Sequence, residues 1–438
     1  MIRHFPKNFK LQNLRKTKVT GSSGLALLMM FARDIGLDKE IERLFSHLKR
    51  RKRGYTTSAK IIAFLQMILK GGDRLNDLDV LRTDPGLLHL GRMESVPRSN
   101  TVADLARKFR LRDLHRLAEI GMRLALRALS AHRMKRLILD IDSTIIASDM
   151  QMAERAYEGT RGFNPLVGML RGGGMNWTSF SLFRPGNAAP QSHNLSLVRK
   201  TVSYLQSHRP DLPIVLRSDS AGYNHRLMRY CDRQGVGFVI AGRDSEAVSQ
   251  IIQGLTDWSP LRGSRRNEEV GESLHFIGSE KTGAVYRLIV VRRKKEQGAL
   301  FPEFDYSYRF YLTNTVWNKN VVVRFYRKRG DAENVIRELK EGYGVDHILS
   351  EDFLAAAFYF QLQLLAYNLV QFFKGVHLER SWWPMRLKQL RYRLLNIAGV
   401  VVRHARTTVL RLTQQYRHFT TFQRVFHLLQ IERVELRL

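Results

Sequence analysis

The spacing of apolar residues divides the chain into a helical first part and a second part of mixed character. Residues 59–69 and 102–129 carry apolar side chains three and four positions apart, which predicts helices. The polar turn at 97–100 precedes the second of these stretches and is suited to a helix N-cap. Residues 1–130 are therefore expected to form a helical N-terminal domain.

From residue 135 onward, short apolar runs alternate with helical patterns. The expected helices are 195–206 and 224–233. Strands are expected at 137–142, 166–170, 178–183, 213–219 and 237–241. This alternation predicts an α/β layer with a mixed sheet over residues 131–242.

The pattern changes again between residues 243 and 318. Runs at 274–278, 285–292 and 308–313 are typical of strands, with no clear helical pattern between them. We interpret 243–318 as an all-β insertion. The chain then becomes helical, so that 319–375 is expected to complete the α/β layer. Residues 376–438 form a basic C-terminal region with 12 Lys or Arg against three Glu, suited to dimerisation or DNA contact.

One stretch, 353–373, is long and apolar enough to raise the question of a membrane span. Polar side chains interrupt it at Gln361, Gln363, Asn368 and Gln371, and no second stretch of this kind exists in the sequence. A buried core helix is the better interpretation, and no membrane partner is expected.

The charge of the chain is far from balanced. Lys and Arg number 72 against 40 Asp and Glu, which gives a formal net charge of +32. Such an excess favours a polyanionic partner, and nucleic acid is the first candidate. A solvated cationic surface and a ribosome-associated protein remain alternatives. The basic run Lys49, Arg50, Arg51, Lys52 and Arg53 is either a solvated loop or an arm that contacts phosphates.

Cysteine content and the start of the sequence bear on location. The single cysteine, Cys231, excludes an internal disulfide framework and a cysteine-based zinc cluster. The basic segment 1–18 has no apolar stretch behind it, so no secretory signal is expected. A cytoplasmic, nucleoid-associated protein fits both observations.

Two aspartates stand at the ends of predicted strands. Asp142 closes the run Leu139-Asp140-Ile141-Asp142, and Asp219 closes Leu216-Arg217-Ser218-Asp219. Ligands gather at the C-terminal strand ends of open α/β sheets, so both carboxylates are expected to converge there. Side chains alternate along a strand, so Asp140 and Asp142 share a face, roughly 6–7 Å apart. Taken alone, an aspartate at a strand end is more often a turn former or a helix cap than a metal ligand.

A third group lies on one face of the predicted helix after residue 320. Tyr326, Arg329, Glu333, Arg337 and Lys340 fall within a stripe of about 80° on a helix of 3.6 residues per turn. An exposed face with ion pairs such as Glu333–Arg337 would give the same spacing.

The spacing Tyr326-x2-Arg329-x3-Glu333-x6-Lys340 resembles the YREK signature of bacterial insertion-sequence transposases of the DDE type. The segments 139–144 and 216–223 are similar to the first and second aspartate motifs of that family. The resemblance implies a ribonuclease-H-like core in which Asp142, Asp219 and Glu333 hold two Mg²⁺ or Mn²⁺ ions. Asp140 stays open as an alternative ligand or a supporting residue.

The same resemblance implies that Tyr326, Arg329 and Lys340 contact the backbone of element-end DNA, and Arg337 joins them as a further candidate. Compact family members have a shorter interval between the second aspartate and the glutamate, so the insertion resembles that of hairpin-forming members. In those relatives an inserted aromatic ring stacks on a flipped base. Trp258 is the first candidate for this role and Trp317 the second, with core packing as the alternative for either ring.

The expected function is that of a DNA transposase. It would cleave the inverted-repeat ends of its element and transfer the 3′-OH strands into target DNA, as a homodimer on DNA. Two alternatives stay open: a DNA-binding protein that has lost catalysis, and a metal-dependent nuclease on the same fold.

Overall fold

The computed structural model of the chain divides into two compact units, which are described separately. Unit 1 combines residues 1–102 with 388–438, and unit 2 comprises 103–387. The residues that the structure describes are 18–49, 53–130, 134–264, 266–279, 283–295, 306–404, 407–413 and 415–431. Arg50, Arg51 and Lys52 of the predicted basic arm lie outside them.

Unit 1 consists of helices and a three-stranded antiparallel sheet in the order β1-β14-β15. The sheet pairs β1, Lys18–Thr20, with β14, Gly399–His404, and β14 with β15, Thr407–Leu412. The α-helices are α1 (Ser23–Asp34), α2 (Leu37–Phe45), α3 (Thr57–Lys70), α4 (Leu78–Arg82), α5 (Pro85–Leu90), the start of α6 (Ser99–Ala106), most of α14 (Leu387–Leu390), and α15 (Phe419–Ile431). Segments from both ends of the sequence therefore build this unit.

Short-range hydrogen bonds fix the ends of the helices in unit 1. Thr56 caps α3 by accepting a hydrogen bond from the backbone N–H of Ala59 at 3.0 Å. Asp84 caps α5 through the N–H of Leu87 at 2.8 Å, and its other oxygen accepts from the Thr20 hydroxyl at 2.9 Å. The same oxygen of Asp84 binds Lys70 at 3.1 Å. One carboxylate thus ties α5 to β1 and to the end of α3.

A nine-stranded mixed sheet runs through unit 2 in the order β10-β11-β12-β13-β9-β8-β2-β6-β7. The strands are β2 (Leu137–Ser143), β6 (Leu166–Gly172), β7 (Met175–Thr178), β8 (Ile214–Ser218), β9 (Gly237–Ala241), β10 (Ser259–Pro260), β11 (Glu268–Ile277), β12 (Ala284–Lys294) and β13 (Tyr306–Thr313). A small second sheet joins β3 (Ile146–Ala147), β5 (Arg161–Phe163) and β4 (Glu154–Arg155).

Five of these strands have the topology expected for a ribonuclease-H-like core. β2, β6 and β7 follow one another antiparallel, and β8 and β9 add in parallel on the other side of β2. The predicted fold class is confirmed. The strand expected at 178–183 lies earlier, at Met175–Thr178, because Gly173 and Gly174 adopt positive φ and reverse the chain directly after β6.

The insertion extends the core sheet. β13 pairs with β9, and a buried apolar cluster that includes Val239, Ile289 and Val322 joins the two parts. A helix that the sequence pattern did not predict, α10 (Glu246–Gln253), begins the insertion. Val248 is the one residue of this helix that is fully buried.

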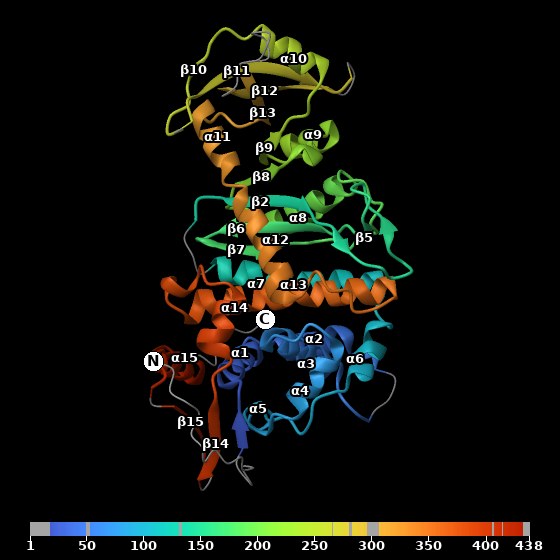
Figure 1. Cartoon of the computed structure of the whole chain (residues 1–438), viewed down its shortest axis with the longest axis vertical. Coiled ribbons are helices and arrows are strands. Elements are labelled where there is room, and N and C mark those ends of the chain that lie inside the picture. The colour runs from blue at the N-terminus through green and yellow to red at the C-terminus, as the bar shows by residue number, and fades with distance from the viewer. Residues whose placement is uncertain are drawn as a thin grey trace, which may run out of the picture. The chain divides into compact units, whose positions relative to one another are not determined.

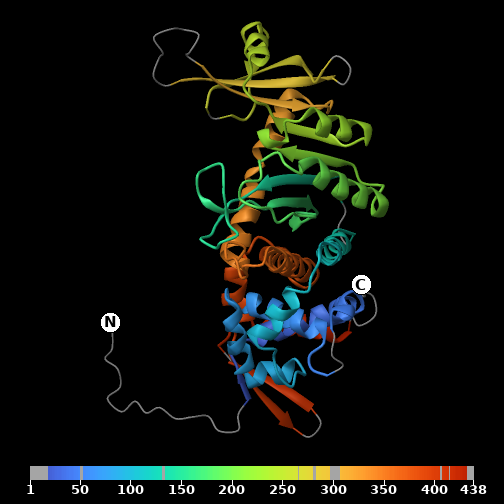
Figure 2. The same ribbon diagram turned by 90° about the vertical axis from the view of Figure 1, so that its right-hand side faces the viewer.

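Helices cover both faces of the core sheet (Figures 1 and 2). α8 (Asn194–His208) and α9 (His225–Arg233) lie on one face, and α11 (Lys319–Arg327) and α12 (Gly330–Tyr343) lie on the other. Asn318 caps α11 at its first turn, and Gly344 ends α12 in the left-handed conformation at φ 69°.

The long apolar helix α13, Phe353–His377, packs against α7 (Leu111–Ser130) and the edge strand β7 (Figure 1). Its most apolar 18-residue window is long enough to cross a membrane, but 89% of that window is buried inside the protein. Asn368 binds the backbone of Thr178 on β7 and the carbonyl of Gly121 on α7. Asn368, one of the polar residues that interrupt this stretch, thus joins α13 to β7 and α7, and the predicted core helix is confirmed.

Candidate active site

The register of two parallel strands brings Asp142 and Asp219 together. β2 and β8 pair from Leu137 with Ile214 to Ile141 with Ser218, a constant offset of 77 residues. Asp142 and Asp219 are the next residues at the same offset. Neighbouring strands lie about 4.8 Å apart, so these carboxylates stand side by side at the C-terminal edge of the sheet.

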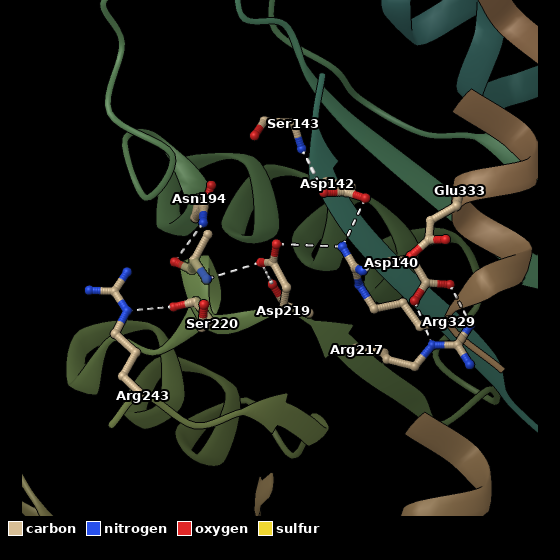
Figure 3. Close-up of polar contacts among 12 residues, drawn as sticks. Asp140, Asp142, Ser143, Asn194, Arg217, Asp219, Ser220, Arg243, Arg329 and Glu333 are labelled. Atoms are coloured by element: carbon tan, nitrogen blue, oxygen red, sulfur yellow. Dashed lines mark hydrogen bonds and ion pairs between the residues drawn. The ribbon is translucent and has the colours of Figure 1, made fainter. Parts of the chain in front are cut away.

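Backbone groups orient both aspartates. The N–H of Ser143 donates to Oδ1 of Asp142 at 3.0 Å, and the N–H of Ala221 donates to Oδ1 of Asp219 at 3.0 Å. The turn after Asp219 is held from two sides (Figure 3). The amide of Asn194 donates to the carbonyl of Ala221 at 3.0 Å, and Arg243 donates to that of Ser220 at 2.9 Å.

The third carboxylate, that of Glu333, comes from helix α12 rather than from a strand. Glu333 lies in the first turn of α12, and Arg329 occupies the N-cap position of the same helix. Nη2 of Arg329 lies 2.8 Å from Oδ2 of Asp142 and 3.5 Å from Oδ2 of Asp219. Nη1 of Arg329 lies 3.3 Å from Oε1 of Glu333. All three predicted acids therefore converge on a single guanidinium group (Figure 3).

Burial differs across this group and sets its electrostatics. The side chain of Asp142 is 14% exposed, that of Asp219 39% and that of Glu333 58%, so the site opens to solvent on the Glu333 side. Burial raises the pKa of Asp142 to about 6; Arg329 opposes this shift, and the charge of Asp219 adds to it. Burial disfavours the charge on Arg329, but Asp142 and Asp219 outweigh it and raise its pKa.

The donor set suits a hard divalent cation. Carboxylate oxygens from Asp142, Asp219 and Glu333 are the ligands that Mg²⁺ and Mn²⁺ prefer. Within the described residues, no three acidic, cysteine or histidine side chains stand arranged around one common metal position. In this arrangement the guanidinium of Arg329 provides the positive charge among the acids.

Asp140, left open as an alternative ligand, has a different partner. It lies opposite Arg217 in the β2–β8 register and binds its guanidinium through two hydrogen bonds of 2.6 and 2.8 Å. Nη1 of Arg217 also donates to the carbonyl of Phe325 on α11 at 2.8 Å. Both side chains are almost completely buried. Asp140 therefore belongs to an ion pair beneath the site rather than to the converging carboxylates.

Sequence reasoning missed Arg217, although a signal for it existed. Asp140 and Arg217 are separated by the same 77 residues as Asp142 and Asp219. A buried Asp and a buried Arg at the separation of two candidate ligands would have indicated both the strand register and the ion pair. Asn194 and Arg243 act on backbone carbonyls, and no sequence pattern marks them.

The prediction of one continuous helix stripe is wrong, because α11 ends at Arg327 and α12 begins at Gly330, so Tyr326 lies on a different helix from Glu333. The remaining members of the stripe have different surroundings. The ring of Tyr326 packs against that of Tyr311 with centroids 4.4 Å apart, and burial raises the pKa of its hydroxyl to about 12. The ammonium of Lys340 donates to the carbonyl of Ile145, in the segment after Asp142, at 2.8 Å. Burial lowers the pKa of Lys340, whereas Arg337 is exposed. Contact of these residues with DNA stays a prediction.

The two candidate aromatic rings lie in separate environments. The guanidinium of Arg292 lies over the ring of Trp258 at 4.1 Å, and the indole N–H of Trp258 donates to the carbonyl of Leu255 at 2.8 Å. Trp317 packs edge-on against Phe325 with centroids 5.0 Å apart, beside the buried cluster of the insertion. Base stacking by either ring stays a prediction.

Two members of the predicted basic arm are described, both in unit 1. The ammonium of Lys49 donates to the carbonyl of Gly54 at 3.0 Å, and Arg53 is exposed. DNA contact by this arm also stays a prediction.

Comparisons with known proteins bear on the whole chain. The model of the family described as "Transposase DDE domain group 1" matches residues 12–434. Among solved structures, the piggyBac transposase in a synaptic complex with hairpin DNA is similar, at 13% sequence identity and a TM-score of 0.45. The match covers 84% of this chain and 78% of that one. No curated protein sequence matches the chain.

Proposed function

Because the chain belongs to the family described as Transposase DDE domain group 1, we propose that it cleaves the ends of its mobile element and joins the freed 3′ ends to target DNA. The convergence of Asp142, Asp219 and Glu333 on Arg329 carries this proposal. A set of three carboxylates open to solvent on one side suits phosphoryl transfer at a DNA backbone, where a phosphodiester must reach the acids from outside.

The three acids have a common role in the proposal. Asp142 and Asp219 offer oxygens from the strand edge, and Glu333 offers its own from α12, so together they would hold two Mg²⁺ or Mn²⁺ ions. When bound, such a pair stabilises the attacking and leaving oxygens of an in-line displacement at phosphorus. Lys340 holds the carbonyl of Ile145 and so fixes the segment that follows Asp142.

The proposed reaction has two displacements of the same kind. In the first, a water oxygen bonds to phosphorus at the element end, the bond from phosphorus to the 3′ oxygen breaks, and that oxygen leaves as a 3′-OH. In the second, this 3′-OH bonds to a target phosphorus, and the target strand leaves with its own 3′-OH. Tyr326, Arg329, Arg337 and Lys340 are the proposed contacts to the phosphates of the element end.

Charge supports DNA as the partner. A net charge of +32 favours a polyanion, and binding should weaken as salt rises because each neutralised phosphate releases counterions. We further propose that the chain acts as a homodimer on DNA, in the cytoplasm and associated with the nucleoid.

The central experiment compares the wild-type chain with Glu333→Gln on a duplex that carries the terminal inverted repeat, with Mg²⁺ added. We expect the variant to lose cleavage by more than about 100-fold, beyond what loss of a supporting residue near a metal costs. Its binding to the same duplex without metal should persist. Glu341→Gln is the matched control, because Glu341 lies on the same helix, is exposed and pairs with Arg386. Equal cleavage by wild type and Glu333→Gln would remove Glu333 from the site.

The same assay separates the two alternatives. A chain that has lost catalysis would bind the repeat but leave it intact at every metal concentration. A plain nuclease would cut duplexes without preference for the repeat and would not join strands. Cleavage at the repeat followed by strand joining distinguishes a transposase from both.

A further inference from the structure

One cation, the guanidinium of Arg329, stands where the three carboxylates meet. It contacts Asp142 at 2.8 Å, Asp219 at 3.5 Å and Glu333 at 3.3 Å, and its side chain is 14% exposed. Figure 3 shows the guanidinium group between the acids of the strand edge and that of α12. Three carboxylates at such close range repel one another, and Arg329 offsets part of that repulsion.

The position of Arg329 conflicts with metal binding. Mg²⁺ binds carboxylate oxygens at about 2.0–2.1 Å, which requires lone pairs directed at the ion. Oδ2 of Asp142 and Oδ2 of Asp219 both face Nη2 of Arg329. A divalent ion that takes these oxygens would also meet a positive charge at short range. The guanidinium and the ions therefore compete for the same oxygens.

From this competition we infer that Arg329 is an exchangeable counter-ion that hinders metal binding until a DNA phosphate takes over its guanidinium. The inference rests on the proposed function, because it concerns how metal ions bind at the same three carboxylates. Metal binding and binding of the element end then favour each other. Metal binding and DNA binding both require the side chain of Arg329 to move from the carboxylates to the phosphate.

The surroundings of Arg329 allow such an exchange. Arg329 is at the junction between α11 and α12, and a Cβ built on the next residue, Gly330, would meet no atom within 4 Å. Its contact partner Glu333 is 58% exposed, so a phosphate can approach from that side. A planar guanidinium binds phosphate through two parallel hydrogen bonds, which makes phosphate a strong competitor for the carboxylates.

Binding of Mn²⁺ to the full-length chain without DNA tests the inference directly. It can be followed by electron paramagnetic resonance of the free ion or by calorimetry. We expect Arg329→Gln to bind Mn²⁺ about 5- to 150-fold more tightly than the wild type, the usual range of coupling between two sites. Lys328→Gln is the matched control, since it removes the same charge from the adjacent, exposed residue. Equal affinity in wild type and Arg329→Gln, or an equal gain in both variants, would overturn the inference.

A second measurement tests the coupling to DNA. The probe is a duplex of the terminal inverted repeat that is already cut at its 3′ end. In the wild type this duplex should raise the affinity for Mn²⁺. In Arg329→Gln the DNA-induced gain should disappear, because the acids are already released. A gain of the same size in both proteins contradicts the inference.

If Arg329→Gln folds poorly, thermal unfolding still tests the inference. In the presence of a chelator the variant should melt below the wild type, since the acids repel one another without their counter-ion. Added Mn²⁺ should then raise its melting temperature more than that of the wild type. Arg329→Lys keeps the charge but cannot bridge three acids, and its Mn²⁺ affinity should lie between the two. An affinity for Mn²⁺ at or below the wild-type value would count against the inference.

The inference and the proposed function fail in different ways. If wild type and Asp142→Asn bind Mn²⁺ equally, the acids are not metal ligands and the proposed function fails. If Asp142→Asn loses Mn²⁺ binding but Arg329→Gln gains none, the site stands and only the role of Arg329 is wrong.

Discussion

The guanidinium of Arg217 binds both oxygens of Asp140, at 2.6 and 2.8 Å. Asp140 lies two residues before Asp142, and Arg217 lies two residues before Asp219. Through its third nitrogen Arg217 also reaches the carbonyl of Phe325 on α11. The ion pair thus ties the two strands that carry the aspartates to the helix that precedes Arg329 and Glu333. It supports the site from beneath.

Breaking this ion pair should destabilise unit 2. Asp140→Asn leaves the buried guanidinium of Arg217 without its counter-charge, and loss of one partner of a buried pair costs about 3–5 kcal/mol. The double change Asp140→Leu with Arg217→Met removes both charges and should recover part of that loss. Urea unfolding of the full chain measures these effects. Unchanged stability of Asp140→Asn, together with lost Mn²⁺ binding, would instead make Asp140 a ligand.

Packing in unit 1 should not tolerate a side chain at Gly24. A Cβ at this position in α1 would overlap the backbone carbonyl of Leu394. Gly24→Ala should therefore lower the free energy of unfolding by about 1–3 kcal/mol, the usual cost of overpacking. Gly21→Ala is the matched control, because a Cβ there meets no atom within 4 Å. Equal melting temperatures for the two variants would contradict this packing.

The buried lysine of α13 predicts a specific pH dependence of stability. Burial lowers the pKa of Lys374 to about 8, while its ammonium donates to the carbonyls of Trp383 and Met385. The unfolded chain keeps a value near ~10.4, so between these pH values the unfolded state holds more protons. The free energy of unfolding contributed by Lys374 should therefore rise from about pH 8 to about pH 10.4, by at most ~1.4 kcal/mol per pH unit.

Comparison with Lys374→Met isolates this contribution. Below about pH 8 the wild type bears the full cost of the buried charge. The stability of the wild type relative to the variant should then increase as pH rises toward ~10. Denaturant unfolding of both proteins across this range gives the two free energies of unfolding. A wild-type free energy of unfolding that falls relative to that of the variant as pH rises would contradict the assigned burial.

Salt dependence tests the proposed DNA contact of Arg337. This residue is exposed on α12, the helix that also carries Glu333. If Arg337 neutralises one phosphate, Arg337→Gln should reduce the slope of log affinity against log salt by about 1. Lys340→Gln should show a similar loss and, in addition, slower cleavage, because the carbonyl of Ile145 loses its donor. An unchanged slope for Arg337→Gln would place Arg337 outside the interface.

Much of the core was predictable because strand patterns are local. The runs that end at Asp142 and Asp219 are short, apolar and bounded by turns, and they form β2 and β8 as expected. Helical spacing placed Glu333 and Lys340 on one helix, and both lie on α12. The convergence of the three acids follows from these elements once the sheet is assembled.

Other features depend on contacts that no local pattern records. The resemblance of residues 326–340 to the YREK signature implied that Arg329 contacts DNA, but no local pattern could reveal that its guanidinium lies among the acids. Likewise, no local pattern indicated that Arg292, on β12, lies over the ring of Trp258. The sheet of unit 1 also depends on pairing between distant segments, since Lys18 on β1 pairs with Val401 on β14.

The pairing of β1 with β14 has a consequence for folding during synthesis on the ribosome. The N-terminal helices are synthesised first, yet the partner of β1 is residues 399–401, near the other end of the sequence. Until β14 and β15 have been translated, β1 lacks its neighbour and unit 1 cannot close. A truncated mRNA that ends before this point would yield a chain that contains Asp142, Asp219 and Glu333 but whose first unit remains incomplete.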